Sequence, residues 1–284
     1  MIRYALLLLL LAFSASARDA ATLFADPQEA ATWQWILART GQQQHVERGS
    51  KGEVKWIGFW DEEKQKGDYY RGSLTLDAEG YVVKMTFNAA HFTNDEYARF
   101  IAFKRLETIT TWHNGWDPNG SDKTVYSGAG LSHLKGSKVA HFNIGGSWFN
   151  DEGMVAANQL PSLRELKVYH TRVTDQGVKA LWDNPHLTYL NLGPQHSQKV
   201  SDACLEAVST ISGLEKLDLD EMLLSWEGGL QHLVALKHLK KLQCKKSFIP
   251  EADLERLRAA LPDVEIDYEP ADEATIAKMR ARQK

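Results

Sequence analysis

The sequence predicts an α/β solenoid, a stack of similar strand–turn–helix units, preceded by a small α+β cap. Three observations support this fold class. A short apolar pattern recurs along most of the chain, each recurrence is followed by residues typical of a helix start, and the first eighty residues lack the pattern. The composition agrees, because 43% hydrophobic and 25% charged residues are ordinary for a folded chain of 284 residues.

Residues 1–17 have the composition of a signal peptide. Arg3 supplies a positive charge, residues 4–13 are apolar with six consecutive leucines, and Ala15-Ser16-Ala17 offers a cleavage pattern of small residues. Ten apolar residues are too few to span a bilayer, which takes about 20. We therefore expect cleavage between Ala17 and Arg18, a secreted or periplasmic protein, and no membrane span after cleavage. An uncleaved anchor is the alternative.

Residues 18–80 do not fit the repeat and predict the α+β cap. Asp26-Pro27 favours the start of a helix, and residues 41–52 are polar and predict a loop. Alternating apolar residues at 54–59 and 74–76 predict two strands, and residues 77–80 predict a turn that leads into the repeats. An independent recognition module is the alternative. Four tryptophans fit the core of this region better than a ligand site: Trp33, Trp35, Trp56 and Trp60.

The repeat is clearest in residues 139–154 and 163–178. Both fit L-x-x-L-x-L-x-x-(S/T)-x-V-(T/N)-D-x-G-(L/V), in which L and V stand for apolar residues. The apolar strand pattern recurs seven times, starting at Val82, Leu106, Val139, Leu163, Leu187, Leu214 and Leu239. Six recurrences are apolar triplets, and the second is the pair Leu106 and Ile109. Most intervals lie in the range of about 20–29 residues that one family of solenoids uses. The interval from Leu106 is longer because it contains an inserted loop at 113–124.

Each repeat predicts a strand, a turn and a helix. In the strand, alternate residues point to one side, so stacked units can share a continuous apolar core. A hydroxyl at Ser147, Thr171 or Ser247 can bond the backbone of the turn. Helix N-cap residues follow, usually with an aspartate in the first turn, at Thr93, Asn150, Thr174 and Ser201. Thr93 and Glu96 also form a capping-box pattern.

These segments resemble the leucine-rich-repeat superfamily, in the variant that reads V-T-D-x-G-L and is shared by cysteine-containing repeats and secreted bacterial proteins. The resemblance covers about residues 82–268. It implies a right-handed βα horseshoe, similar to ribonuclease inhibitor, with parallel strands along a concave face. We expect the repeat domain at 81–268, ending in a terminal strand at 264–268, and a charged tail at 269–284 that is frayed helix or disorder. The ligase-adaptor role of F-box relatives does not carry over, because the chain has no recognisable F-box.

The cysteines and histidines predict no metal site and no cofactor. Cys204 falls on a helix and Cys244 on a strand two repeats away, so both are expected to be buried free thiols. His113, His141 and His170 are expected on successive coils near the same strand edge, but strands about 4.8 Å apart separate the outer two too far for one ion. A calcium loop at 117–122 is disfavoured because its terminal glutamate is absent.

The functional hypothesis is an exported protein that binds another protein, or another envelope macromolecule, and is not an enzyme. Aromatic side chains surrounded by polar ones are typical of binding hot spots. On the concave face the candidates are Trp112, His141, Asn143, Lys167, Tyr169, Tyr189, Asn191 and Asp218, and in the inserted loop they are Trp116 and Asp117. The net charge of −4 does not favour nucleic acid as a partner, and a monomer is expected.

Two alternatives belong to other classes. The first is an envelope scaffold that assembles with copies of itself. The second is an enzyme with activity in the N-terminal region, which is less favoured because no catalytic motif is present, whether a nucleophile elbow, a phosphate loop or a zinc motif.

Overall fold

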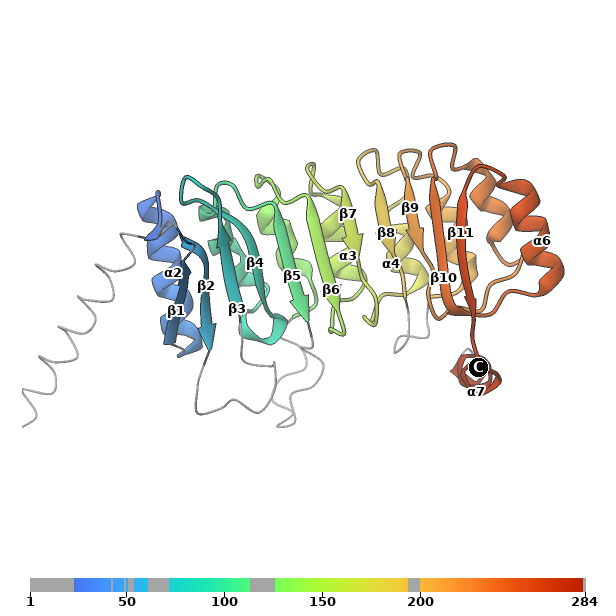
Figure 1. The fold of residues 1–284 in the computed structure, drawn as a ribbon, viewed down its shortest axis with the longest axis horizontal. Coiled ribbons are helices and arrows are strands. Elements are labelled where there is room, and N and C mark those ends of the chain that lie inside the picture. The colour runs from blue at the N-terminus through green and yellow to red at the C-terminus, as the bar shows by residue number, and fades with distance from the viewer. Residues whose placement is uncertain are drawn as a thin grey trace, which may run out of the picture.

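The computed structural model describes residues 23–41, 43–48, 50, 54–60, 72–112, 126–193 and 200–282. The expected signal peptide and the loop residues Trp116 and Asp117 lie outside these ranges. In the described part, eleven strands form one sheet in sequential order from β1 to β11. Figure 1 shows the strands side by side along the length of the molecule, with most helices in a layer behind them.

The N-terminal part is a helix and an antiparallel set of strands that continues directly into the repeats. Its elements are α2 (Pro27–Thr40), β1 (Gln43–Arg48), β2 (Val54–Trp60) and β3 (Gly72–Leu76). β3 pairs antiparallel with β4 (Val82–Asn88), which is the first strand of the repeats. As expected, Asp26 caps α2 and its side chain accepts the N–H of Gln28. Trp33 is buried and Trp35 is half-buried; the side chains of Trp56 and Trp60 are not described.

The prediction of a polar loop at 41–52 is wrong, because β1 forms there. Its residues are almost all polar, so they give no alternating apolar signal. β1 pairs only with β2 and is therefore the edge of the sheet, where polar side chains are the usual composition.

Glu29 joins α2 to the first repeat. Its side chain is completely buried, and its carboxylate accepts the N–H of Val82 at 2.9 Å and the N–H of Lys104 at 3.2 Å. Burial raises the pKa of this carboxyl, although the two N–H donors act in the opposite direction. The two bonds satisfy donors that would otherwise be buried without partners.

From β4 onward the strands are parallel and in register. The seven recurrences of the apolar pattern fall on seven successive strands, β4 to β10, so the repeat register read from the sequence is confirmed. The terminal strand is also present. Beyond β4, the strands are β5 (Thr108–Trp112), β6 (His141–Gly145), β7 (Glu165–Lys167), β8 (Tyr189–Asn191), β9 (Lys216–Asp218), β10 (Lys241–Ser247) and β11 (Glu265–Pro270).

The second half of most repeats is helical, but many of the helices are 3₁₀ rather than α. A 3₁₀ helix rises about 2.0 Å per residue, so it covers the length of a coil with fewer residues than an α-helix. The 3₁₀ helices are η2 (Ala89–His91), η3 (Asp95–Ala102), η4 (Ala129–Leu134), η5 (Asp202–Cys204) and η6 (Leu230–Ala235). The α-helices are α3 (Asp151–Asn158), α4 (Asp175–Lys179), α5 (Leu205–Val208), α6 (Glu251–Ala260) and α7 (Glu273–Arg282).

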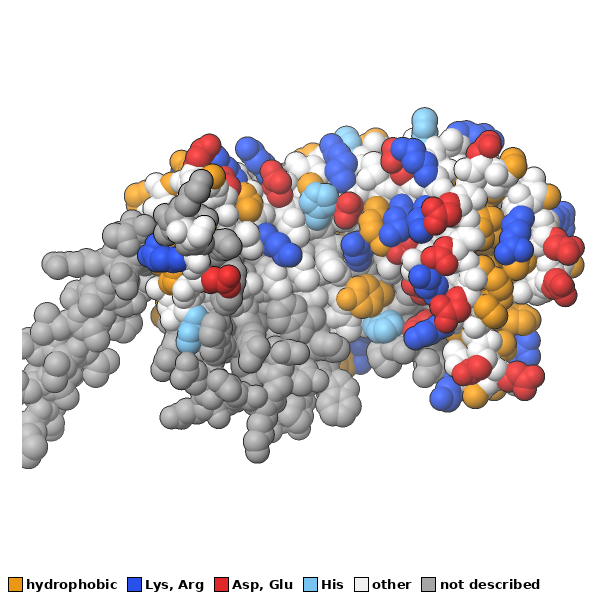
Figure 2. Space-filling model, viewed as in Figure 1, with side chains coloured by type: hydrophobic (Ala, Val, Ile, Leu, Met, Phe, Trp, Pro, Cys, Tyr) orange, Lys and Arg blue, Asp and Glu red, His pale blue; other side chains and the backbone are white. Residues whose placement is uncertain are grey.

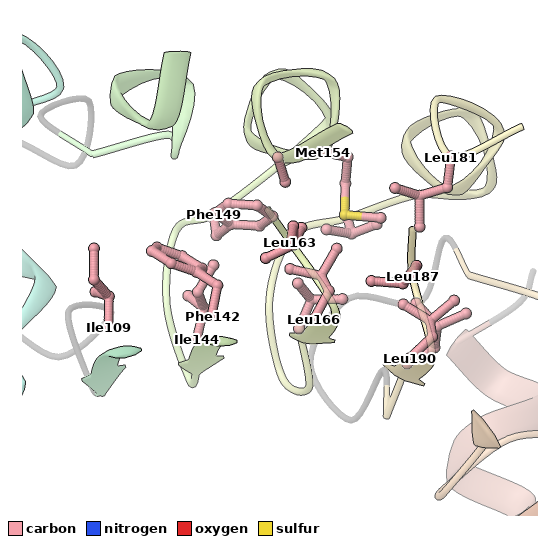
Figure 3. Packing of buried hydrophobic residues seen from close by; sticks show 14 of the residues in the cluster. Ile109, Phe142, Ile144, Phe149, Met154, Leu163, Leu166, Leu181, Leu187 and Leu190 are labelled. Carbon is pink, nitrogen blue, oxygen red and sulfur yellow. The ribbon is translucent and has the colours of Figure 1, made fainter. Parts of the chain in front are cut away.

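The core is a continuous apolar layer between the sheet and the helices. Figure 3 shows side chains of successive strands, such as Phe142, Leu166 and Leu190, pointing toward the helices and stacking on equivalent residues of the next coil. These three side chains are at most 1% exposed. Burying a Leu or Phe side chain stabilises a protein by roughly 1.5–3 kcal/mol, so the stacked layer supplies the main folding energy.

The turn and cap residues behave as the repeat pattern predicts. Thr171 Oγ1 donates to the carbonyl of Val168 at 2.8 Å, and Ser147 Oγ accepts the N–H of Phe149 at 3.2 Å. Asn150, Thr174 and Ser201 accept backbone N–H groups at the starts of their helices. Thr93 and Glu96 make both bonds of the capping box.

The aspartates of the repeats also link one coil to the next, which the sequence did not indicate. Asp151 accepts both the N–H and the hydroxyl of Thr174, Asp175 does the same with Ser201, and Asp202 does so with Ser225. Asp151 and Asp175 therefore bind the N-cap residue of the following coil, and Asp202 binds Ser225, which precedes η6 of its following coil. These bonds form a ladder from coil to coil.

The C-terminal tail, for which a frayed helix or disorder was predicted, forms a regular helix. This is the ten-residue helix α7, with Asp272 accepting the N–H of Thr275 and Met279 only 8% exposed. One buried side chain in a polar segment is a weak sequence signal. Both cysteines are buried and free, as predicted. Among the residues described, none of the helices is long and apolar enough to cross a membrane.

Candidate ligand-binding face

The strand face is the side of the repeat sheet opposite the core, formed by residues that alternate with the buried ones. The in-register pairing aligns these residues in columns across the strands. From β6 to β10 the first column contains His141, Glu165, Tyr189, Lys216 and Lys241, and the next contains Asn143, Lys167, Asn191, Asp218 and Gln243. The predicted site residues on β6–β9 are therefore brought together on one surface.

Tyr189 is the centre of a cluster of hydrogen bonds and cation–π contacts on this face. Its hydroxyl donates to Asp218 Oδ2 at 2.5 Å and accepts from Lys216 Nζ at 3.0 Å. The ammonium groups of Lys216 and Lys167 lie 4.1 and 4.8 Å from the centre of its ring, within the range of cation–π contacts. Burial and the neighbouring Asp218 carboxylate raise the pKa of Tyr189 above its ordinary value, so the hydroxyl stays protonated and acts as a donor.

Asp218 lies beneath this cluster rather than on its surface. It is 2% exposed, and its Oδ2 also accepts from Asn191 Nδ2 at 3.1 Å. Its other oxygen, Oδ1, is buried and makes no hydrogen bond to any residue that the structure describes. Asp218 therefore positions Tyr189 and Asn191 and does not present an accessible carboxylate.

Tyr169 packs against two glycines, Gly145 and Gly193. A Cβ atom on Gly145 would overlap the Tyr169 ring, and a Cβ on Gly193 would lie 3.3 Å from Tyr169 Cβ. Sequence reasoning assigned no role to these two glycines. The sequence signal for this packing was a glycine in the same column as a large aromatic residue of the next coil, because only glycine leaves room for the ring.

His170 follows Tyr169, and its side chain extends past the coil of β8 to Glu221, which follows β9. Its Nε2 lies 3.1 Å from Glu221 Oε2, and both residues have a left-handed backbone, with φ of 55° and 62°. His141 lies at the start of β6 and pairs through Nδ1 with Glu165 at 3.3 Å. The two histidines lie at opposite ends of their strands, so the expectation that they share a strand edge is wrong. Within the described ranges, no group of three His, Cys, Asp or Glu side chains could hold a metal ion.

Lys167, on β7, differs from the lysines on β9 and β10 in having no carboxylate of a described residue close to its ammonium group. Lys216, Lys241 and Lys245 each lie within 4.0 Å of a carboxylate, whereas Lys167 has no such neighbour among the described residues and contacts the Tyr189 ring. The ammonium of Lys167 therefore carries a charge that the described side chains do not neutralise. For Trp112 the structure describes only the backbone, at the end of β5.

The C-terminal part of the face is dense in charge but largely paired within itself. Lys241 binds Glu265 at 2.5 Å and Lys245 binds Asp267 at 3.1 Å, while Asp220 accepts from Gln243 Nε2 at 2.7 Å. Figure 2 shows these alternating positive and negative side chains over β9–β11.

Comparison with known proteins gives structural likenesses only. No protein-family model and no curated protein matches the chain. A leucine-rich-repeat protein of Leptospira interrogans is 18% identical, with 60% of this chain and 45% of that one covered and a TM-score of 0.38. An internalin of Listeria monocytogenes is 18% identical, with 71% and 59% covered and a TM-score of 0.45. A protein of Bacteroides fragilis is 17% identical, with 67% and 66% covered and a TM-score of 0.39.

The chain thus spans less than two thirds of the length of each of these three structures. Its own geometry decides the fold: seven parallel strands in register, each followed by a turn and most by a short helix, share one apolar layer and a terminal strand. The chain has an α/β solenoid fold of the leucine-rich-repeat type.

Proposed function

We propose that the chain is an exported binding protein that holds a macromolecular partner, in the first instance a protein, on the strand face around Tyr169 and Tyr189. The observation that carries this proposal is the cluster of Lys167, Tyr169 and Tyr189, in which two aromatic rings and one ammonium without a carboxylate partner lie on adjacent strands. Tyrosine supplies contact area at low entropic cost and is enriched at hot spots.

The cluster is preorganised by its supports. Asp218 fixes the Tyr189 hydroxyl, and Gly145 gives the Tyr169 ring its position. Side chains that are already held in place lose little conformational freedom on binding, so more of the contact energy appears as affinity. The role is binding and not catalysis, with residues 18–80 as a cap, 81–268 as the repeat domain and 269–284 as the tail.

The test is capture of a partner from envelope extract by the mature chain, followed by measurement of the dissociation constant. We expect Tyr169→Ala and Lys167→Ala each to weaken binding about tenfold or more, the range for a hot-spot side chain. Lys241→Ala is the matched control, because that lysine lies on the same face but is already paired with Glu265. Equal affinities of the partner for all three variants and the unaltered protein would exclude this surface as the binding site.

Export and self-assembly have separate tests. Mass spectrometry of the protein from an expressing cell should find a mature N-terminus at Arg18; an N-terminus at Met1 would contradict cleavage. Light scattering should show a monomer at every concentration, and growth of the particle with concentration would favour the envelope-scaffold alternative.

A further inference from the structure

At the C-terminal end of the solenoid, a groove of about 470 Å³ lies between helix α7, the turn after β9 and the ends of β10 and β11. Its walls include Glu221 from the turn after β9, Lys246 and Glu269 from the ends of β10 and β11, and Asp272 and Lys278 from α7 and its cap. Met279 and Pro270 supply apolar surface. The volume lies within the range of about 300–1,000 Å³ that small-molecule sites occupy. The groove is separate from the Tyr169–Tyr189 cluster.

The charged groups in the groove differ in whether they already have a hydrogen-bond or ion-pair partner. Glu221 is bound to His170, and Asp272 accepts the N–H of Thr275 at the start of α7. Lys246, Lys278 and Glu269 form no ion pair with any other described residue. The Lys278 ammonium attracts the Asp272 carboxylate across the groove without forming an ion pair, whereas Lys246 and Glu269 have no neutralising partner in the described part of the chain.

The backbone adds a second observation. Glu221 and Lys246 occupy equivalent positions of successive coils, Glu221 in the turn after β9 and Lys246 at a bulge near the end of β10, and both have positive φ, 62° and 51°. This conformation is unfavourable for residues with a Cβ atom, and it persists only where the surrounding structure holds it. Such positions cluster at ligand sites. Here two of them form adjacent parts of one wall.

We infer that this groove binds a small amino-acid zwitterion, with preference for an acidic one such as glutamate. An α-ammonium group is the complement of the Glu269 carboxylate, and two carboxylates are the complements of Lys246 and Lys278. The methylene groups between them would lie against Met279 and Pro270. A ligand with a single charge would leave at least one unpaired group of the opposite sign facing it.

The methyl group of Met279 provides a direct readout, because Met279 lines the groove whereas Met85, Met154 and Met222 are buried elsewhere in the core. Methyl NMR of the full mature chain should show a saturable shift of the Met279 signal on titration with L-glutamate, and none of the three core signals should move. Glutarate lacks the ammonium group and L-glutamine lacks the second carboxylate, so both should bind several-fold more weakly than glutamate.

Single substitutions test what each charged side chain contributes to binding, apart from any effect on folding. Lys278→Gln should weaken glutamate binding about two- to fivefold, the range for one exposed charge pair. Lys246→Asn keeps a residue that tolerates the left-handed conformation and should act similarly. In the Glu269→Gln variant, glutamate and glutarate should bind with equal affinity, because the carboxylate that would pair with the ligand's ammonium group is gone. Residue 269 lies outside α7, so this result does not depend on whether substitutions in α7 loosen that helix. Lys240→Gln, an exposed lysine paired with Glu215, is the control and should bind as the unaltered protein does.

The inference is overturned if glutamate does not move the Met279 signal, or if glutarate binds as tightly as glutamate to the unaltered protein. It is also overturned if Lys240→Gln weakens binding as much as Lys278→Gln does, because the effect would then be one of net charge. None of these results depends on whether a macromolecule binds the strand face.

Discussion

Both carboxylate oxygens of Asp151 are bonded to Thr174 of the next coil: Oδ1 accepts the backbone N–H at 2.8 Å and Oδ2 accepts the hydroxyl at 2.7 Å. Thr174 in turn caps α4 by accepting the N–H of Gln176. One aspartate thus begins its own helix and fixes the start of the next. Because each coil contacts only its neighbours, such bonds between coils set the cooperativity of the solenoid.

Replacing Asp151 with alanine should therefore lower the free energy of unfolding by about 3 kcal/mol, since two part-buried hydrogen bonds to a charged group are lost and each contributes at least about 1.5 kcal/mol. Urea unfolding followed by circular dichroism measures this change. Glu152→Ala is the control, because the neighbouring Glu152 side chain is exposed. A loss no larger than that of the control would show that the ladder adds nothing to stability.

Gly177 is required because of the same aspartate. A Cβ atom at this position would lie 3.1 Å from the Cα of Asp151 and closer still to its carboxylate. Gly177→Ala should cost about 1–3 kcal/mol, the usual range for an overpacked site, although alanine is intrinsically the better helix former. Gly213→Ala should be nearly neutral, because the nearest atoms to its Cβ are 3.6 and 4.0 Å away.

The decisive measurement at Gly177 is a double-mutant cycle. In the Asp151→Ala background the carboxylate is gone, so Gly177→Ala should cost at least about 1 kcal/mol less than it does alone. Strictly additive losses would mean that the glycine is needed for some other reason.

These two residues also show how far the sequence could be interpreted. The period of the apolar residues predicted β4 to β10, because a strand that is buried on one face must alternate and a solenoid must repeat. The same local reasoning assigned Asp151 only to its own helix start. Its bonds to Thr174 depend on how two coils align, which no single repeat specifies.

The strand face shows the same limit. Alternation identified Tyr169, Tyr189 and Lys167 as outward residues, but not that Gly145 makes room for a ring or that Asp218 is covered. Those facts depend on packing between strands about 4.8 Å apart. The polar edge strand β1 was missed, and the tail helix α7 was predicted only as frayed helix or disorder, because neither has a clear apolar period.

The thiols of Cys204 and Cys244 should be inert in the folded protein. Both side chains are completely buried, and burial raises the pKa of both thiols well above the ordinary value, with nearby aspartates adding to the effect. The thiolate is the reactive form. Iodoacetamide at mildly alkaline pH should therefore add nothing to the folded chain and two groups to the chain in urea, as counted by mass spectrometry. A single adduct on the folded protein would show that one cysteine is accessible.

His91 should make the protein less stable as the pH falls from about 6.5 to about 4. Both of its ring nitrogens are buried, and burial, with the positive charge of Arg39 as a second cause, lowers the pKa of His91 to about 4. The unfolded chain therefore takes up a proton near pH 6.5 while the folded protein does not, so protonation favours unfolding until the pH reaches the folded pKa. One group can contribute up to about 1.4 kcal/mol per pH unit over this window.

The variant His91→Gln removes the titrating ring, so its free energy of unfolding should depend less on pH between 6.5 and 4 than that of the unaltered protein. Urea unfolding at several pH values gives the two slopes. His133→Gln is the matched control, since the His133 side chain is exposed and lies on η4, away from the buried contacts of η2. Should the His91→Gln variant keep the full slope of the unaltered protein, the acid sensitivity would have to come from other groups.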